Sequence, residues 1–380
     1  MWAHRQYAIL QRNVRHITCL PIYGAMTIAV LGSATALGQA REGCCGQSYP
    51  AAEYQVANAE NSVAFYHDVL GLEYPPGWTG KINAASQAQS QLTGAINGLI
   101  RVVALPIPGA SWHMQIVDTT GIDRKPVAPR RQDIGAPGLI LYVRNLDASA
   151  AALKKTGAPI VTIGGAPVPI GGNNSKSRAI LAKDPDGFFI ELRQMDPLPQ
   201  TSAPATSNVI GARVAVSIGD TGQTTRYWRD LLDFDVDSDA AFSKDSVELA
   251  LQGAPGAQVR KSIATLRTNG KFAHPDVVFE FLEFKNIERR VLVPRYQDPG
   301  SGAFVLRLRT GNSGIRGKEM ADLVKLLKAS PQAKILTAGG DALDQGRRLA
   351  MFTQDLNGFI LEATQSTGDA TESSGGQPRK

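Results

Sequence analysis

An internal repeat constrains the fold of this chain more than any other feature of its sequence. The segment 122–144, IDRKPVAPRRQDIGAPGLILYVR, returns in register as segment 287–309, IERRVLVPRYQDPGSGAFVLRLR. Two further pairs repeat in the same order, AFYHDVLGLEY with RYWRDLLDFDV, and DPDGFFIEL with DLNGFILEA. Because self-similarity over such lengths is typical of a duplicated structural unit, the sequence predicts a tandem duplication.

Each half is predicted to contain the same order of strands and helices twice. In the first module, apolar patterning predicts a strand, a helix and two strands at 54–57, 61–70, 100–105 and 112–117. In the second module, it predicts the same order at 139–143, 148–156, 178–181 and 188–192. The fold class is therefore α+β, with four β-α-β-β-β modules in the whole chain.

Composition predicts the domain boundaries. Residues 1–40 combine an arginine-bearing start with an apolar run, which predicts a cleaved signal peptide. The mature protein is then expected to be periplasmic or secreted, without stable membrane insertion. The alternative is that the segment is retained as a membrane anchor. A Pro/Ser/Thr/Ala-rich linker is expected at 197–208, and a disordered polar tail at 364–380. We expect two domains, 41–196 and 209–363, each formed by two consecutive modules.

Charge and cysteine content exclude several classes of protein. The formal charge of +6 includes three arginines of the signal segment, and no basic stripe with interleaved aromatics is present, which argues against nucleic acid as a partner. The mature chain would keep only the adjacent Cys44 and Cys45, as exposed thiols, a strained vicinal bridge or an intermolecular link. No Cys/His pattern of a zinc site occurs.

The pattern of modules resembles the vicinal oxygen chelate superfamily, which includes glyoxalase I, extradiol dioxygenases and bleomycin-resistance proteins. The resemblance rests on NAENSVAFYHDVLGLEY, on KDPDGFFIELRQ and on their second copies, and it extends over residues 51–363. It implies four βαβββ modules paired into two glyoxalase-like cup-shaped domains. It also implies that a cup holds a divalent metal by four side chains, taken from the first and last strands of its modules.

Transferring these ligand positions to the chain gives an incomplete set. The first-strand positions, which lack a suitable donor, are Ala51, Gly138, Arg213 and Ala303. The last-strand positions, which carry oxygen donors, are Gln115, Glu191, Glu280 and Glu362. Strand alternation places each of these donors on the concave face, and His113 shares that face with Gln115. We therefore expect a degenerate metal site that holds either no cofactor or a weakly bound divalent metal.

Several residues are candidates for binding a ligand. Arg213, Glu280 and Glu362 are expected to converge in the second cup as an ion-pair cluster that replaces a metal, or else Arg213 holds a carboxylate or polar group of a ligand. In the first cup, His113 and Trp112 are candidate ligand contacts, although Trp112 also fits a plain core position.

The leading functional hypothesis is an exported protein that binds a small organic molecule in its cups, with metal chemistry weakened or lost. The alternative is an active divalent-metal-dependent lyase or dioxygenase, in which Glu191 or Glu280 would carry a proton. A third hypothesis is a structural or partner-binding descendant of such an enzyme. The repeated Arg130/Asp133 and Arg295/Asp298 pairs are expected to fix the connections between modules.

Overall fold

The computed structural model describes residues 50–367 except 76, 78–81, 83–89, 96, 172–174, 240, 267–276, 309–318 and 347. The predicted signal segment, Cys44, Cys45 and residues 368–380 lie outside the described residues. Residues 364–366, expected in a disordered tail, instead continue the last strand. Within the described ranges, every helix is too short or too polar to span a membrane.

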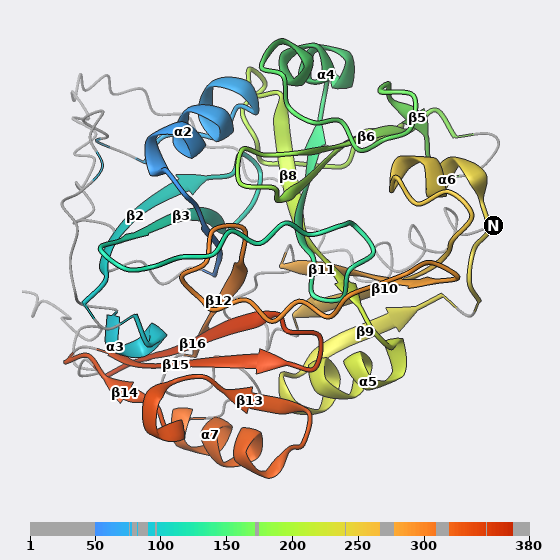
Figure 1. Ribbon diagram of the computed structural model, residues 1–380. Helices are drawn as coiled ribbons and strands as arrows, with labels where there is room; N and C mark the ends of the chain where they lie inside the picture. The colour runs from blue at the N-terminus through green and yellow to red at the C-terminus, as the bar shows by residue number, and fades with distance from the viewer. Residues whose placement is uncertain are drawn as a thin grey trace, which may run out of the picture.

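The first half of the described chain forms two modules, coloured blue to green in Figure 1. Module 1 consists of β1 (Ala51–Gln55), α2 (Ala59–Ala64), a π-helical turn (Phe65–Val69), α3 (Ser90–Thr93), β2 (Leu99–Pro106) and β3 (His113–Thr120). Module 2 consists of β4 (Pro137–Val143), α4 (Leu146–Lys155), β5 (Val168–Pro169), β6 (Arg178–Lys183) and β7 (Phe189–Gln194).

The second half forms two more modules, coloured from yellow-green to red in Figure 1. Module 3 consists of β8 (Val209–Ile218), α5 (Thr221–Arg226), a π-helical turn (Tyr227–Leu231), β9 (Phe234–Ser238), α6 (Ser246–Leu251), β10 (Gln258–Leu266) and β11 (Val278–Lys285). Module 4 consists of β12 (Gly302–Leu308), α7 (Met320–Ala329), β13 (Ala333–Ile335), a 3-10 turn (Ala338–Gly340), β14 (Leu343–Asp344), β15 (Arg348–Asp355) and β16 (Ile360–Ser366). The α+β class is confirmed.

The modules pair into two eight-stranded sheets, but not with the partners expected from the sequence. One sheet has the order β13-β15-β16-β12-β1-β3-β2, with β14 beside β15, and so joins modules 1 and 4. The other has the order β5-β6-β7-β4-β8-β11-β10-β9 and joins modules 2 and 3. The expectation that consecutive modules pair within 41–196 and within 209–363 is therefore wrong, although four modules in two domains is right.

The connections between modules explain this pairing. Asp133, in the connection from module 1 to module 2, accepts hydrogen bonds from Arg130 and also from the Arg290 side chain, at 2.7 Å, in the connection from module 3 to module 4. Asp298 in turn accepts from Arg295 and from the Lys125 amide, at 2.9 Å. The two connections are thus bound to each other, which confirms their predicted structural role.

Side-chain caps begin the first helices of modules 1 to 3. Asn58 accepts a hydrogen bond from the Asn61 amide, Asn145 from the Ala148 amide and Asp220 from the Gln223 amide. Each cap directly follows a first strand, so the chain turns at once onto the sheet. The helix predicted at 61–70 is confirmed in position, and it ends at Gly71, whose φ of 84° suits glycine.

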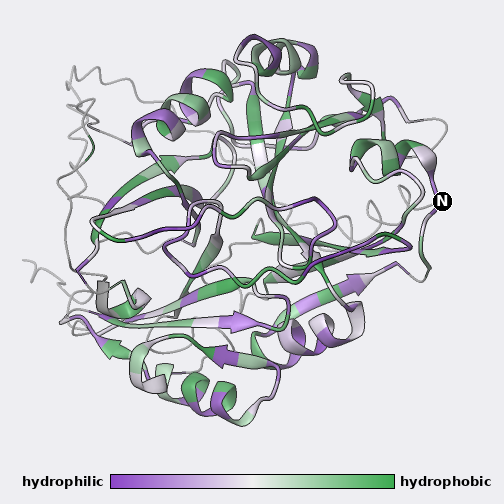
Figure 2. Cartoon of the chain, viewed as in Figure 1, coloured by the Kyte–Doolittle hydropathy of each residue, from purple (hydrophilic) through white to green (hydrophobic). Residues whose placement is uncertain are grey.

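The hydrophobic core lies between the helices and the sheets. Its largest buried side chains include Tyr54, Tyr66, Trp228, Phe279 and Phe304. Figure 2 shows hydrophobic residues along the central strands, whereas the edge strand β9 is mainly hydrophilic. Because strand residues alternate between faces, the residues between these core positions lie on the opposite face of each sheet, and that face carries the candidate sites.

Candidate functional site

The predicted site residues separate into two groups, one on each sheet. We call the face of the module 1–4 sheet that lies opposite the hydrophobic core the first cup; it carries Gln115 and Glu362. The corresponding face of the module 2–3 sheet is the second cup, which carries Glu191, Arg213 and Glu280. The predicted convergence of Arg213 and Glu280 with Glu362 is therefore wrong. That prediction assumed that modules 3 and 4 share a sheet.

Arg193 lies at the centre of the second cup, and sequence reasoning missed it. Its Nε donates to Glu191 Oε1 at 2.5 Å, while Nη1 and Nη2 donate to Glu280 Oε2 and Oε1 at 2.8 and 2.6 Å. All three residues are buried. Arg193 follows Glu191 by two positions in β7, so strand alternation was the signal that could have identified it.

The remaining contacts of Glu191 complete the cluster. Gln252, directly after α6, donates from Nε2 to Glu191 Oε2 at 3.2 Å, and its own Oε1 accepts from Arg131 Nε at 2.8 Å. All four carboxylate oxygens of Glu191 and Glu280 therefore accept hydrogen bonds from other side chains.

The charges of the second cup shift the pKa values of its members. Burial alone would raise the pKa of Glu280, but the Arg193 guanidinium outweighs burial and holds that pKa well below its usual range. Burial lowers the pKa of Arg131 to about 10, against the attraction of Glu191 and Glu280. Glu280 and Arg131 are therefore both charged at neutral pH.

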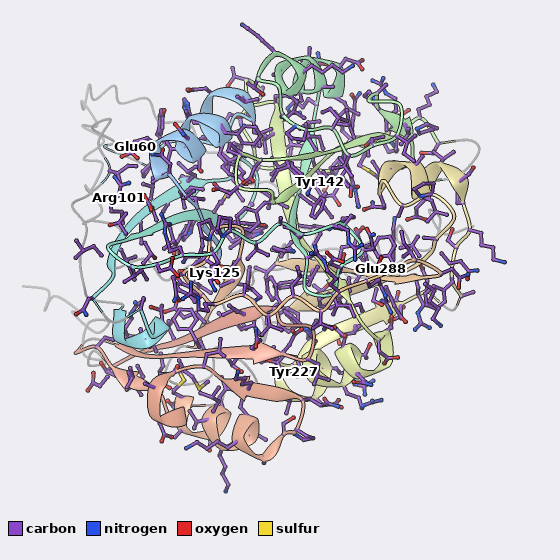
Figure 3. All side chains as sticks on the ribbon, viewed as in Figure 1. Glu60, Arg101, Lys125, Tyr142, Tyr227 and Glu288 are labelled. Carbon is purple, nitrogen blue, oxygen red and sulfur yellow. The ribbon has the colours of Figure 1, made fainter. Side chains whose placement is uncertain are left out.

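Arg213 lies at the margin of this cluster. Its Nη1 is 4.0 Å from Glu280 Oε2, its side chain is 27% exposed, and its guanidinium lies over the Tyr142 ring, 5.5 Å from the ring centre. Tyr142 is labelled in Figure 3. Since Arg193 already binds both Glu280 oxygens, Arg213 is the arginine of this cup with the weakest internal partner.

The first cup contains a buried carboxyl pair of which the sequence transfer identified only one member. Glu53 lies two residues after the assigned position Ala51 and opposite both Gln115 and Ala303 in the neighbouring strands. Tyr296 donates its hydroxyl to Glu53 Oε2 at 2.8 Å. A glutamate between the alanines and the tyrosine of β1 was the signal in the sequence, since burial of an acid in such a strand requires a partner.

Glu53 and Glu362 titrate as a pair. Burial raises the pKa of Glu53 to about 8, and repulsion from Glu362 adds to this effect, whereas the hydrogen bond from Tyr296 and the charge of Arg348 oppose it. Arg348 Nη2 lies 3.8 Å from Glu362 Oε1. At neutral pH the pair therefore retains one proton.

The two other predicted residues of the first cup behave differently from each other. His113 is nearly buried and its Nε2 lies 3.0 Å from Gln115 Nε2, so it shares the cup face as expected. Trp112 belongs to the hydrophobic core, where its ring packs edge-on against Phe304 at 6.3 Å. The core interpretation of Trp112 is the one that fits its position.

Two short helices cover the cups. From α3, Leu92 packs with Tyr296 and Phe352 over the first cup. From α6, Leu251 packs with Phe189 and Leu181 over the second cup, and Figure 1 shows α6 beside β5. Each cup is thus lined by polar residues at its centre and closed by an apolar side chain from an inserted helix.

A further charged cluster lies outside both cups. Arg101 Nη1 is 2.7 Å from Glu60 Oε1 on α2, and Figure 3 labels both residues at the edge of module 1. Arg101 also pairs with the buried Asp118, which accepts a hydrogen bond from the Ala59 amide at the start of α2. This cluster attaches α2 to the sheet.

Among the described residues, neither cup brings together three side chains of the kinds that most often hold a divalent metal. In the described part of the chain, no group of three or more His, Cys, Asp or Glu side chains is placed to hold a metal ion. In the second cup the Arg193 guanidinium lies between the two carboxylates, and in the first cup Glu53 and Glu362 have no third such ligand among the described residues. Tight transition-metal sites normally have three protein ligands.

Comparisons with known proteins identify the fold. No family model and no curated protein matches the sequence. Two single-residue variants of glyoxalase I from Zea mays align at 15% and 14% identity, both with a TM-score of 0.50, over 83% of this chain and 91% and 92% of theirs. A Bacillus subtilis protein described as a candidate dioxygenase aligns at 10% identity and a TM-score of 0.46, over 84% of each chain. The likeness to glyoxalase I shows the fold: the chain has the glyoxalase I fold, with four modules paired into two domains.

Proposed function

We propose that this protein binds a small organic molecule in its cups and that an internal guanidinium replaces metal chemistry in the second cup. The position of Arg193 carries the proposal. Its guanidinium supplies the positive charge that the buried Glu191 and Glu280 require, and three hydrogen bonds hold it between them. A divalent cation would have to displace Arg193 to reach these carboxylates, at the cost of leaving a buried guanidinium without a partner.

The charges of the second cup favour an anionic ligand. Arg131, Arg193 and Arg213 act on the two carboxylates of Glu191 and Glu280. Lys261 also lies near these carboxylates, but its charge is balanced by its partner Glu248. The cluster as a whole therefore has one positive charge in excess. The excess lies at Arg213, which is the most exposed of the three arginines and has the aromatic face of Tyr142 beneath it. A small carboxylate with a flat apolar body matches this combination.

The alternative, a divalent-metal-dependent lyase or dioxygenase, depends on the first cup. Glu53 on the first strand of module 1 and Glu362 on the last strand of module 4 are the two carboxylates that it offers. That function requires a further ligand: among the described residues no His, Cys or Asp side chain completes the set, and Gln115, which lies opposite Glu53, is the remaining oxygen donor. Export of the mature protein, from the segment 1–40, remains part of the proposal.

Titration with benzoate tests the ligand proposal. Binding is measured by isothermal titration calorimetry for the unaltered protein, for Arg213→Gln and for Arg226→Gln, which removes an exposed arginine of α5 as a matched control. We expect Arg213→Gln to weaken benzoate binding about tenfold, because a charge-assisted hydrogen bond to a carboxylate is lost, and the control to change it less than twofold. Equal affinity in all three proteins would refute the role of Arg213.

A further inference from the structure

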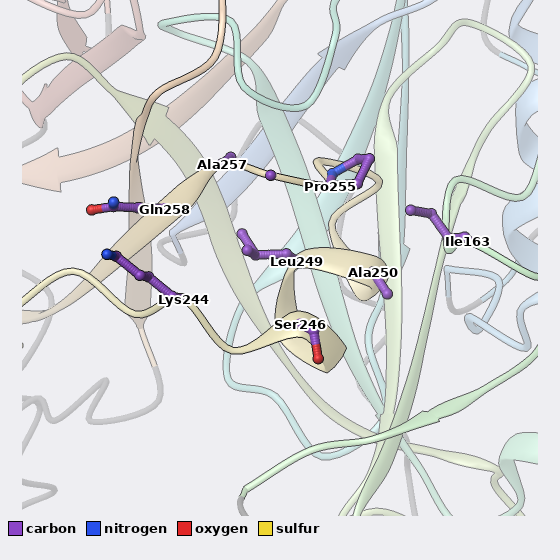
Figure 4. A pocket seen from close by; sticks show the side chains of 9 residues that line it. Ile163, Lys244, Ser246, Leu249, Ala250, Pro255, Ala257 and Gln258 are labelled. Atoms are coloured by element: carbon purple, nitrogen blue, oxygen red, sulfur yellow. The ribbon is translucent and has the colours of Figure 1, made fainter.

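A pocket of about 430 Å³ lies outside the cups, on the outer side of α6. Figure 4 shows its lining residues, which come from α6, from the segments on either side of it and from the loop after α4. This volume falls within the range of small-molecule sites. The pocket is separate from the ion cluster of the second cup, because Leu251 and Gln252 at the end of α6 turn inward to that cup.

The pocket has an apolar end and a polar end. Its apolar wall consists of Ile163, Leu249, Ala250, Pro255 and Ala257. At the opposite end, Lys244 and Gln258 lie close to each other, with their nitrogen atoms at the same side of the pocket (Figure 4). The apolar wall reaches the protein surface at Ile163, which is 49% exposed. Large apolar side chains at a rim are typical of a surface that contacts a ligand.

Backbone and side-chain contacts hold the pocket open. The Ile163 amide donates to the Ala250 carbonyl at 2.9 Å, which joins the loop of module 2 to α6 of module 3. The Thr162 hydroxyl donates to the Leu251 carbonyl at 3.3 Å. Because these bonds fix both walls before any ligand binds, the pocket is preorganised.

The charges around the pocket leave Lys244 available. Glu248 of α6 is paired with Lys261, and the Asp245 carboxylate accepts hydrogen bonds from the Val247 and Glu248 amides at the start of the helix. Lys244 has no ion pair with any described residue. An ammonium at one end of an apolar pocket is the arrangement that binds an organic anion by its charged end.

We propose that this pocket is a second binding site, which takes a small amphipathic organic anion with its charged group at Lys244 and its apolar body against Leu249 and Ile163. The probe for the test is 8-anilinonaphthalene-1-sulfonate, which has both an apolar body and a fixed negative charge. Its fluorescence is titrated against the purified protein and against Lys244→Gln and Ile163→Asp. Both changes affect exposed side chains and leave the core intact.

The proposal predicts one saturable site per chain, with affinity reduced about fivefold in Lys244→Gln and about tenfold in Ile163→Asp. Lys155→Gln and Val293→Asp, which alter an exposed lysine and an exposed valine elsewhere, should leave the affinity unchanged. Arg213→Gln should also leave it unchanged, which separates this pocket from the second cup. Octanoate should displace the probe. Absence of saturable binding, or equal affinities for the pocket variants and the controls, would overturn the proposal.

Discussion

Replacing Arg193 by methionine should expose how the second cup is stabilised. The substitution keeps much of the side-chain volume but removes three hydrogen bonds and leaves Glu191 and Glu280 buried without their guanidinium. Removing one partner of a buried ion pair costs about 3–5 kcal/mol of unfolding free energy. Urea unfolding followed by circular dichroism at pH 7 should show a loss of that size.

The pH dependence makes this prediction specific. In the unaltered protein the pKa of Glu280 lies below that of the unfolded chain, so its stabilising contribution is complete above the usual glutamate range and is lost as pH falls through the folded pKa. In Arg193→Met, burial would instead raise the pKa of both carboxyls, so the deficit should shrink as pH falls from 7 toward 4. Adding Glu280→Gln to the variant should recover part of the loss at pH 7. A deficit below about 1 kcal/mol that does not change with pH would show that Arg193 does not stabilise the two buried carboxylates.

Three further predictions test other parts of the structure. Because the pKa of Glu53 is raised to about 8, the folded state binds more protons than the unfolded chain above the usual glutamate pKa. The free energy of unfolding should therefore fall as pH rises from 5 to 8. Urea titrations at several pH values should show this slope in the unaltered protein and a flatter one in Glu53→Gln. Gly135→Ala should lower the free energy of unfolding, measured by thermal unfolding, by several kcal/mol, because the φ of Gly135 is 89° and the new Cβ would lie 2.3 Å from the Asn357 carbonyl oxygen. The control Gly157→Ala, with a φ of 72° and open space around it, should lower it by only about 1 kcal/mol. N-terminal sequencing of the protein exported by its host should begin near residue 39 or 41; an intact start in the membrane fraction would favour the anchor.

The sequence predicts the local structure of this protein well because local structure depends on local patterns. Alternating apolar residues identify strands such as Ile100–Leu105, which the structure extends to Leu99–Pro106 as β2. The repeated arginine–aspartate pairs likewise identify the connections as structural, because the same polar pattern is kept in both copies.

The partners of each module could not be predicted in the same way. The four modules share one sequence pattern. The first strand of each module is therefore equally able to pair with the first strand of any other module. The connections decide the pairing, through contacts such as Arg290 with Asp133 that join residues far apart in the sequence. Glu53 was not predicted because the family's ligand position was assigned to Ala51, two residues earlier on the same face of β1. Arg193 was not predicted because an arginine cannot be a metal ligand, so only the neighbouring Glu191 matched a ligand position.

Metal content and metal affinity test whether the Arg193 guanidinium takes the place of a cation. The protein is purified without chelator, dialysed against zinc, manganese or nickel salts and then against buffer, and analysed for metal per chain. If Arg193 takes the place of a cation and the first cup has no third ligand, the account predicts well below one metal per chain in every preparation, and no change in unfolding free energy on adding the salts. About one tightly bound metal per chain that stabilises the protein would contradict the account and favour the metalloenzyme.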